Sequence, residues 1–431
     1  MKISTYIFLL AIVLPAIASA QMSKGTSGTF ALTNASIETV TQGTKSGTLL
    51  IQDGRIAAIG QGIQIPANAE QIDCSGMTIY PGMIDAGTQI GLSEIGAVDL
   101  TQDHNEVGNL TPQMQALTAV NPNSVLIPVT RVSGVTTALT SPTGGLFSGT
   151  ASLINLHGYT PAQMYAGFKG VVLRFPSGGR RSRFDRRSEE EVKKQQEKAL
   201  KTLNEVWDKA KTYSKIEVAH RAGRGDAPAY YPEMAALAPV TRGETTLLIE
   251  VNAASDIQSA LKWIEKQTVT AVLTGVAEGW RVADEIAKAN IPVIVGPVLA
   301  SPSRASDKYD RPYANPGLMV KAGVRVAIRS NETENVRNLP YNAGFAATYG
   351  MGKEEALKAV TITPAKIFGV DKQIGSLEVG KIANLFVADG DPFETRTTVH
   401  HVFINGWQIP MESRHTRLYD EFLERSPGLR K

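Results

Sequence analysis

The sequence of 431 residues has little of several residue types that define whole classes of protein: it holds one cysteine, six histidines and 6% aromatic residues. A single cysteine excludes an internal disulfide, so Cys74 is expected to pack as a small apolar group. The 44 lysines and arginines nearly balance the 41 aspartates and glutamates, which predicts no nucleic-acid partner. Beyond the N-terminus no apolar run is long enough to cross a bilayer, so no membrane insertion is expected.

The first apolar run has the layout of a secretory signal peptide. Lys2 supplies the positive start, residues 7–14 form the apolar centre, and Ala18-Ser19-Ala20 is a small-x-small cleavage site. We therefore expect residues 1–20 to be a signal peptide and the remaining chain to be exported. A bacterial periplasm is the compartment that fits an exported chain without a disulfide framework.

The rest of the chain divides by its pattern of apolar residues. Residues 81–370 alternate strand-like runs with helical stretches, which is typical of an α/β fold with a parallel sheet wrapped by helices. Short strands separated by turns fill residues 21–80 and 371–413, and a charged tail spans residues 414–431. The long charged stretch 188–213 is predicted to form an amphipathic helix on the outside of the central domain.

Residues 81–89 carry the most informative motif, Pro81-Gly82-Met83-Ile84-Asp85-Ala86-Gly87-Thr88-Gln89. The motif resembles the first barrel strand of the amidohydrolase superfamily, which reads Pro-Gly-(Leu/Met)-Ile-Asp-x-His-x-His. Residues two apart on a strand point to the same face, so the two histidines of that motif can share a divalent metal. Here Gly87 and Gln89 occupy the two histidine positions, and neither offers a good metal ligand.

Two further motifs near the C-terminus support the same resemblance. Thr363-Pro364-Ala365-Lys366 and the stretch from Gly375 to Asn384 stand where imidazolonepropionase-like amidohydrolases have Thr-x-x-Pro-Ala and Gly-Ser-(Leu/Ile)-x-x-Gly-Lys-x-Ala-Asp. The resemblance covers nearly the whole mature chain. It implies a (β/α)₈ TIM barrel with a composite β-sandwich formed by the N- and C-terminal segments. It also implies hydrolysis of a non-peptide carbon–nitrogen bond in a small molecule.

The resemblance further implies a metal site at the barrel mouth, and the remaining ligand positions are also altered. Such enzymes use a divalent metal to lower the pKa of a bound water, and a carboxylate after strand eight to accept its proton. Asn252 stands after strand five where a histidine would be expected, and strand six ends at Thr274-Gly275 without one. Asn331 replaces the aspartate after strand eight. With all five positions changed, we expect no bound metal and no other cofactor.

Other residues are candidates for a ligand pocket or for chemistry without metal. His104 lies beside carboxylates in the loop after strand one and could act as a general base or belong to a replacement metal site, or could belong to a solvated polar loop. Glu332 follows strand eight and could replace the missing carboxylate, or could cap the next helix. If the mouth still binds a ligand, the old ligand positions should line the pocket and suit an uncharged polar molecule: Gly87, Gln89, Asn252 and Asn331.

Two functions therefore stay open at this point. The chain is either an amidohydrolase-like hydrolase that works without the usual metals, or a non-catalytic relative with the same fold. The relative would bind a small-molecule ligand at the old active-site mouth, form a homo-oligomer, or partner an active amidohydrolase paralogue. Copurification with a histidine-complete paralogue would favour the partner role, and turnover by the isolated chain would favour the hydrolase.

Overall fold

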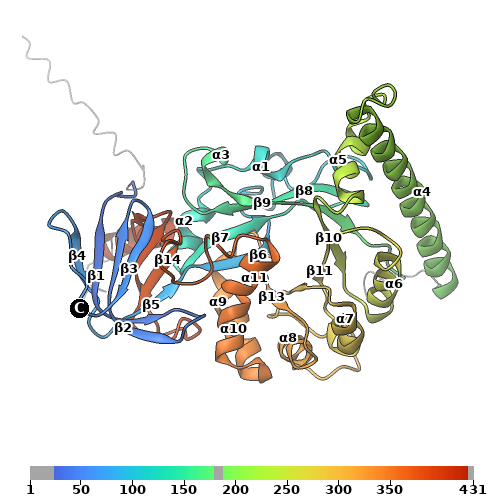
Figure 1. Ribbon diagram of the computed structural model, residues 1–431. Helices are drawn as coiled ribbons and strands as arrows, with labels where there is room; N and C mark the ends of the chain where they lie inside the picture. The colour runs from blue at the N-terminus through green and yellow to red at the C-terminus, as the bar shows by residue number, and fades with distance from the viewer. Residues whose placement is uncertain (1–23, 179–187, 426–431) are drawn as a thin grey trace, which may run out of the picture.

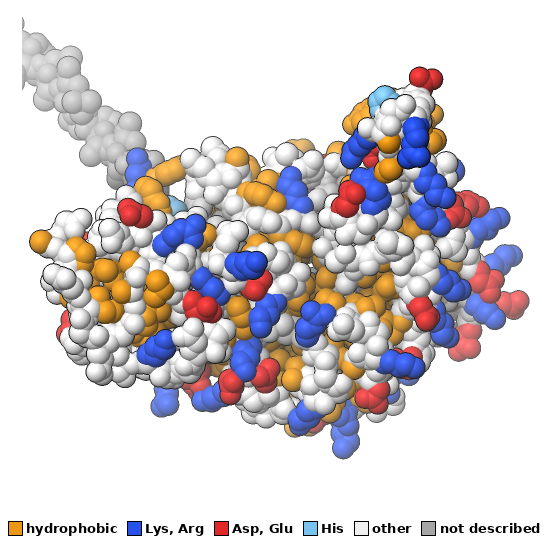
Figure 2. Space-filling model, in the orientation of Figure 1, with side chains coloured by type: hydrophobic (Ala, Val, Ile, Leu, Met, Phe, Trp, Pro, Cys, Tyr) orange, Lys and Arg blue, Asp and Glu red, His pale blue; other side chains and the backbone are white. Residues whose placement is uncertain are grey.

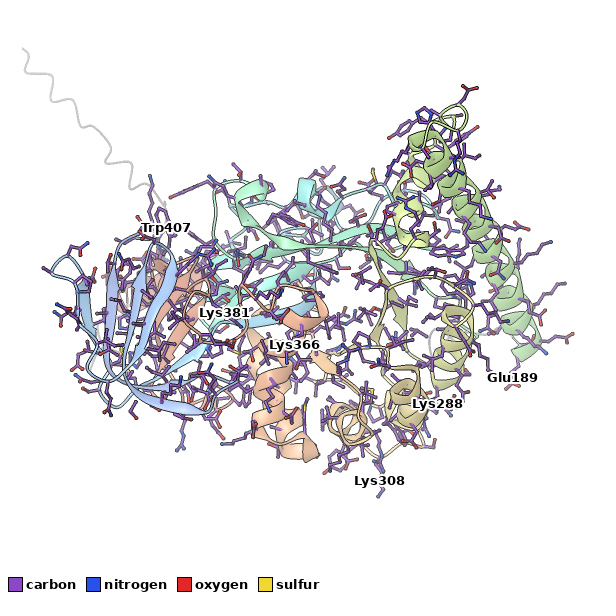
Figure 3. The ribbon with its side chains drawn as sticks, viewed as in Figure 1. Glu189, Lys288, Lys308, Lys366, Lys381 and Trp407 are labelled. Atoms are coloured by element: carbon purple, nitrogen blue, oxygen red, sulfur yellow. The ribbon has the colours of Figure 1, made fainter. Side chains whose placement is uncertain are left out.

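The computed structural model describes residues 24–178 and 188–425 and contains two eight-stranded sheets (Figure 1). The expected signal peptide, residues 1–20, and the last part of the charged tail lie outside the described residues. One sheet curves into a barrel surrounded by helices, and the other stands beside it. Trp407 in the second sheet and Glu189 at the far edge of the barrel domain lie at opposite ends of the molecule (Figure 3).

The smaller sheet joins the two ends of the chain, as the resemblance implies. Strand β5 from the N-terminal segment pairs antiparallel with β14 from the C-terminal segment, with Leu385 opposite Pro81. The sheet folds around its own apolar core, in which the rings of Phe30 and Phe403 lie 5.2 Å apart. Its strands are β1 (Phe30–Glu38), β2 (Thr44–Gln52), β3 (Arg55–Gly60), β4 (Glu70–Asp73), β5 (Thr78–Pro81), β14 (Leu385–Ala388), β15 (Val399–Ile404) and β16 (Trp407–Ile409).

The barrel sheet has eight strands in sequence order, which confirms the predicted TIM-barrel class. Its strands are β6 (Met83–Thr88), β7 (Val135–Thr140), β8 (Phe147–Asn155), β9 (Tyr165–Arg174), β10 (Thr246–Val251), β11 (Ala271–Gly275), β12 (Val293–Val295) and β13 (Val326–Ile328). The third strand, β8, runs antiparallel to both β7 and β9. Only residues 141–146 join β7 to β8, and a parallel crossover needs a dozen residues or more, so this connection forms a hairpin.

Helices cover the outside of the barrel and close its base. The amphipathic helix expected at 188–213 is present as α4 (Glu189–Arg221), which begins with a capping box at Ser188. Its buried Trp207 stacks on Phe147 and packs edge-on against Trp263. The other helices are α1 (Ala116–Ala119), α2 (Leu126–Arg131), α3 (Pro161–Met164), α5 (Pro232–Thr241), α6 (Ala254–Ile264), α7 (Ala283–Ala289), α8 (Arg311–Lys321), α9 (Leu339–Ala346), α10 (Lys353–Ala359), α11 (Ile362–Ile367) and α12 (Arg414–Arg425), with shorter turns η1 (Asp99–Thr101), η2 (Gly279–Arg281), η3 (Val336–Asn338) and η4 (Ala347–Met351).

None of the helices within residues 24–178 and 188–425 is both long and apolar enough to cross a bilayer. Lysines and arginines are interspersed with aspartates and glutamates over the face seen in Figure 2. The charged side chains therefore form no patch of a single sign on that face.

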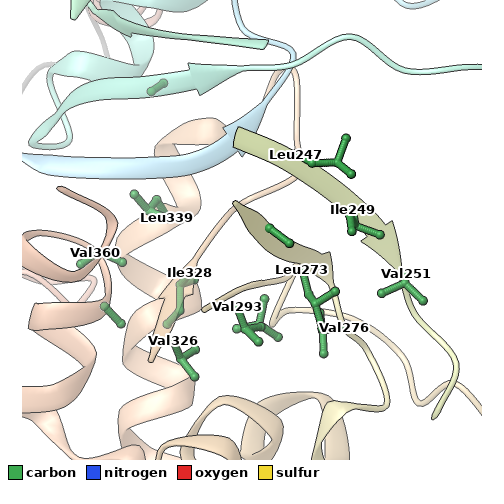
Figure 4. Close-up of a cluster of buried hydrophobic side chains, with 14 of the residues drawn as sticks. Leu247, Ile249, Val251, Leu273, Val276, Val293, Val326, Ile328, Leu339 and Val360 are labelled. Atoms are coloured by element: carbon green, nitrogen blue, oxygen red, sulfur yellow. The ribbon is translucent and has the colours of Figure 1, made fainter. Parts of the chain in front are cut away.

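Successive side chains of the barrel strands point alternately to an outer core and an inner core. Along β10, Leu247, Ile249 and Val251 belong to the large cluster shared with the surrounding helices (Figure 4). Leu248 instead packs inside the barrel, in a cluster that includes Phe368, which follows α11. Because successive side chains on a strand point to opposite faces, position 250 must also face the barrel interior.

Candidate functional site

The site is the layer of side chains directly above the apolar core of the barrel. Each of four neighbouring strands has an apolar residue in the inner core: Leu248, Val272, Ile294 and Ala327. Two residues further along each chain, the same inward face carries Glu250, Thr274, Gly296 and Arg329. These positions are at the carboxyl ends of the strands, which is the end where barrel enzymes place their active sites.

Arg329 and Glu250 form a bidentate ion pair in this layer. The Arg329 Nη1 and Nη2 atoms donate to the two Glu250 carboxylate oxygens at 2.8 and 2.9 Å. Arg329 Nε also donates to the carbonyl of Gly296 at 3.2 Å, and the hydroxyl of Thr274 donates to Glu250 at 2.7 Å. Two parallel charge-assisted bonds of this kind fix both the position and the orientation of the pair.

The pair is largely screened from water, and its energetics follow from that position. The Arg329 and Glu250 side chains are 10% and 29% exposed. Burial alone would raise the pKa of Glu250, but the Arg329 charge and the bonds from Arg329, Thr274 and Asn252 outweigh it and lower that pKa to about 2. Glu250 is therefore a carboxylate at all ordinary pH values.

Gly87, at the first position of the altered motif, lies under the Arg329 side chain. A Cβ atom at Gly87 would stand 2.9 Å from Arg329 Cδ, closer than such atoms approach. A Cβ at Gly275, at the end of strand six, would stand 2.6 Å from a Glu250 oxygen. Thus the ion pair fills the space that a side chain at Gly87 would need, and Glu250 and Asn252 together fill the space at Gly275.

Asp85, in the same motif as Gly87, holds the backbone next to the ion pair. It is fully buried and accepts hydrogen bonds from the backbone N–H groups of Gly87, at 3.0 Å, and Ser330, at 3.1 Å. Burial raises the pKa of Asp85 to about 6, against the opposing effect of these bonds and of Arg329. The bond to Ser330 ties β6 to the segment after β13 and so helps to close the barrel.

A cavity of about 180 Å³ opens above the pair. Glu250 and Arg329 line it together with Asn252 and Asn331, two of the four residues predicted for a ligand pocket. The side-chain amide of Asn331 has no hydrogen-bond partner among the described residues. The cavity also takes residues from the loops that follow β11 and β12 and from the start of α8, including Trp280, Ser301, Asp307 and Arg311.

The other predicted site residues lie elsewhere around the mouth. Gly87 and Gln89 are not in the cavity lining, and Gln89 instead accepts a weak hydrogen bond from Thr333 at 3.5 Å. The backbone carbonyl of Glu332 accepts from the Thr88 hydroxyl, which anchors the segment after β13. His104 is half-buried in the loop after β6, and burial lowers its pKa. Neither His104 nor Glu332 lines the cavity.

The residues of the mouth do not fit a divalent metal. Zinc takes thiolate, imidazole and carboxylate ligands, in sets of three or four. Within residues 24–178 and 188–425, no three histidine, cysteine, aspartate or glutamate side chains come together in a way that could hold a metal ion. The one carboxylate at the centre, Glu250, already binds a guanidinium with both oxygens.

Sequence reasoning did not identify Glu250 and Arg329 as site residues. Their signal was nevertheless present: each is a single charged residue at the end of an apolar strand, in Leu247-Leu248-Ile249-Glu250 and Val326-Ala327-Ile328-Arg329. Charges of opposite sign at the same end of two inward-facing strands indicate a buried pair. Trp280 and Arg311 lie in loops and at a helix start, where no periodic pattern marks them.

Known proteins share both the sequence and the fold. The sequence profile described as "Amidohydrolase family" matches residues 78–409. A 5-methylthioadenosine/S-adenosylhomocysteine deaminase of Thermoanaerobacter pseudethanolicus is 27% identical over 315 residues, which are 64% of this chain and 70% of that protein. An imidazolonepropionase of Shouchella clausii is 38% identical over 86 residues, 19% of each chain.

The fold comparison agrees with the sequence comparison. The crystal structure of an amidohydrolase from Thermotoga maritima MSB8 matches with a TM-score of 0.77 and 26% identity, covering 88% of this chain and 99% of that one. The chain therefore belongs to the amidohydrolase family, a family of hydrolases acting on carbon–nitrogen bonds, and carries imidazolonepropionase-like motifs.

Proposed function

We propose that this member of the family has lost the divalent-metal site and binds a small polar molecule in the cavity at the barrel mouth. The observation that carries the proposal is the Arg329–Glu250 ion pair, whose arginine stem lies over Gly87. A guanidinium is a permanent cation, so it neutralises the central carboxylate and repels a second cation at the same place. The pair thus supplies the charge balance that a metal would otherwise provide.

The carboxylates of the site are poorly suited to hydrolysis without a metal. A general base works best when its pKa is near the operating pH, and the pKa of Glu250 is lowered to about 2. Asp307 also lines the cavity, but it forms an ion pair with Arg281. Asp85 has a pKa of about 6, yet it is fully buried and accepts backbone hydrogen bonds outside the cavity lining. We therefore favour binding without turnover over metal-free hydrolysis.

The amides of the mouth support a ligand-binding role. Asn252 uses its Nδ2 atom on Glu250, at 3.2 Å, which leaves its oxygen free to accept. Asn331 presents both a donor and an acceptor, and both amides belong to exposed residues at the cavity rim. Such groups bind an amide or another uncharged polar function of a ligand.

Export and a partner role belong to the same proposal. The signal-like layout of residues 1–20 supports a periplasmic protein. A binding protein with an amidohydrolase fold could act alone, as a homo-oligomer, or beside a histidine-complete paralogue. Copurification of tagged protein from its own organism would distinguish these arrangements.

Metal analysis tests the proposal. Protein purified without chelators should contain zinc, iron and manganese well below one equivalent, and calorimetric titration with zinc should show no tight site. The control is Arg325→Gln, which removes an exposed arginine at the start of β13, far from the mouth. Stoichiometric metal that is retained on dialysis and lost in Glu250→Gln would overturn the proposal. Turnover of cyclic amides or N-acyl amino acids by the isolated chain would overturn binding without catalysis.

A further inference from the structure

A second cavity, of about 190 Å³, lies on the outside of the barrel against strands β8 and β9. Because β8 runs antiparallel to its neighbours, its two connections are short, and the second of them, residues 156–164, holds only the four-residue helix α3. Residues 112–115 and α5 cover the outer face of this hairpin instead, and the cavity remains between them. The Thr150 backbone N–H donates to the Met114 carbonyl at 2.7 Å, which fixes the 112–115 wall on β8.

Lys169 is the one charged residue among the described residues that line this cavity. It stands on the outer face of β9, two positions before Val171, which packs in the outer core. Its Nζ atom donates to Gln115 Oε1 at 2.8 Å and lies 5.6 Å from the centre of the Tyr165 ring. Both neighbours are uncharged, and no carboxylate of the described residues lies within ion-pair distance of Lys169. This cavity therefore has a net positive charge, whereas the lining of the mouth contains two arginines and two carboxylates.

The hydrogen-bonding groups beside Lys169 are mainly donors. The ammonium group has three N–H bonds and uses one of them on Gln115, whose oxygen is thereby occupied and whose Nε2 group is left to donate. The Thr245 hydroxyl, directly before β10, forms no hydrogen bond within the described part of the chain. Gln113 Oε1 is buried, so it presents no acceptor to the cavity. Val171 and Ala236 add apolar surface to the lining.

We infer that this cavity is a second binding site, which takes a short aliphatic monocarboxylate. The carboxylate accepts charge-assisted hydrogen bonds from Lys169 and further bonds from Gln115 and Thr245. A single lysine balances one negative charge, so a dianion would remain partly uncompensated. The alkyl chain of the acid lies against Val171 and Ala236, where it removes apolar surface from water. The site is separate from the barrel mouth, and the inference does not rest on the proposed function.

Matched acids and amides test the inference on the full chain. The probes are propionate and butyrate, each compared with its own amide, so that the two members of a pair differ by one charge. Ligand-observed NMR titration at constant ionic strength gives a dissociation constant for each probe. We expect at least one acid to bind more tightly than its amide by about fivefold or more, because only the acid forms charge-assisted hydrogen bonds with Lys169.

Variants of Lys169 identify the source of that preference. Lys169→Gln should lower the affinity for the acid by about fivefold or more and leave the affinity for the amide within about twofold. Lys169→Arg keeps the charge and should keep the preference. The matched control is Lys288→Gln, which neutralises an exposed lysine on α7 (Figure 3) and should change neither affinity.

A variant that fills the cavity without changing its charge gives a second test. Ala236→Leu adds bulk from α5 and should weaken the binding of acid and amide alike, so it also decides the question if Lys169→Gln fails to fold. Equal binding of acid and amide, no binding of either acid, or acid binding that is unchanged in Lys169→Gln or in Ala236→Leu would overturn the inference. None of these outcomes affects the proposed function, which metal retention and turnover test at the mouth.

Discussion

The two ends of the barrel both carry asparagine clusters, and the clusters differ in how completely their amides are bonded. At the base, Asn384 donates to Asn155 at 2.9 Å and accepts from the backbone of Asn405 at 2.7 Å. Asn155 in turn donates to the Asn405 side chain at 3.2 Å. At the mouth, the Asn331 amide has no partner among the described residues and faces the cavity.

The difference shows how one residue type serves stability at one end and recognition at the other. Asn384 and Asn155 are buried, and they connect the smaller sheet to barrel strand β8, near Lys381 at the junction of the two domains (Figure 3). Buried amides must be bonded, so this network holds the domains together. Amides left unbonded at an exposed rim cost little and are available to a ligand. Both clusters contain a departure from the motifs described above, because Asn384 at the base and Asn331 at the mouth each stand at an aspartate position.

Removing the arginine of the central pair should produce the largest loss of stability. Arg329→Met leaves the Glu250 carboxylate without its partner, and an uncompensated charge in a largely buried site costs about 3–5 kcal/mol. The double variant Arg329→Met with Glu250→Leu should recover most of that loss. Denaturant unfolding measures both, and a loss below about 1 kcal/mol in the single variant would show that the pair is not buried in solution.

The loss of stability at low pH should be the second-largest effect. The pKa of Glu250 is lowered from 4.5 to about 2, so its stabilisation is complete above pH 4.5 and is lost as the pH falls towards 2. After allowance for its partly exposed side chain, we expect about 2–3 kcal/mol over this interval. Unfolding curves of Glu250→Gln should lack this loss.

Asp85 provides an internal contrast for the same pH titration. Its pKa is raised to about 6, so its contribution has the opposite sign: stability increases as the pH falls from 6 towards 3.8. Asp85→Asn should remove that increase and leave the loss below pH 4.5 unchanged. If Glu250→Gln still lost stability below pH 4.5 as the wild type does, the assignment of the low pKa to Glu250 would be contradicted.

Breaking the amide network at the base should cost more than removing the amide at the mouth. Asn384→Ala leaves Asn155 and the Asn405 backbone without their bonds, which should cost about 2–3 kcal/mol of unfolding free energy. Asn331→Ala should cost below about 0.5 kcal/mol and should instead weaken ligand binding. Equal losses of stability in the two variants would remove the distinction between the clusters.

Restoring family residues at the mouth should produce little metal binding and little hydrolysis. In the triple variant Gly87→His, Gln89→His and Asn331→Asp, the new imidazole at position 87 meets the Arg329 stem, at a cost of roughly 1–3 kcal/mol for overpacking. The ligands from strands five and six remain absent, so we expect weak metal binding and little hydrolysis. The measurement is metal-supplemented turnover of a small cyclic amide by wild type and variant side by side. A large metal-dependent rate would mean that the mouth has changed less than we propose.

The sequence was sufficient for the architecture because local patterns determine it. Apolar runs predicted strands that end at 251, 274, 295 and 328, and the structure ends β10, β11, β12 and β13 within one residue of these positions. The reversed strand β8 was not predicted, since its direction depends on the short connection 141–146 rather than on the strand itself. An alternating pattern of apolar residues is the same whether the strand runs parallel or antiparallel to its neighbours.

The centre of the site depends on contacts that no local pattern contains. Glu250 and Arg329 are 79 residues apart, and they meet only because β10 and β13 both turn these positions into the barrel. Gly87, one of the altered positions of the motif, lies against the Arg329 side chain of this pair. The Arg329 side chain lies over Gly87 because of the register of β10, β11, β12 and β13. That register is set only in the folded chain.

Diffraction from crystals grown with zinc tests the central claim most directly. Data collected on both sides of the zinc absorption edge locate any bound zinc, while the electron density shows the Arg329 side chain. We predict no anomalous peak at the barrel mouth and a guanidinium that remains bidentate on Glu250. A zinc peak between Gly87 and Glu250, with Arg329 swung out of the barrel, would contradict the account.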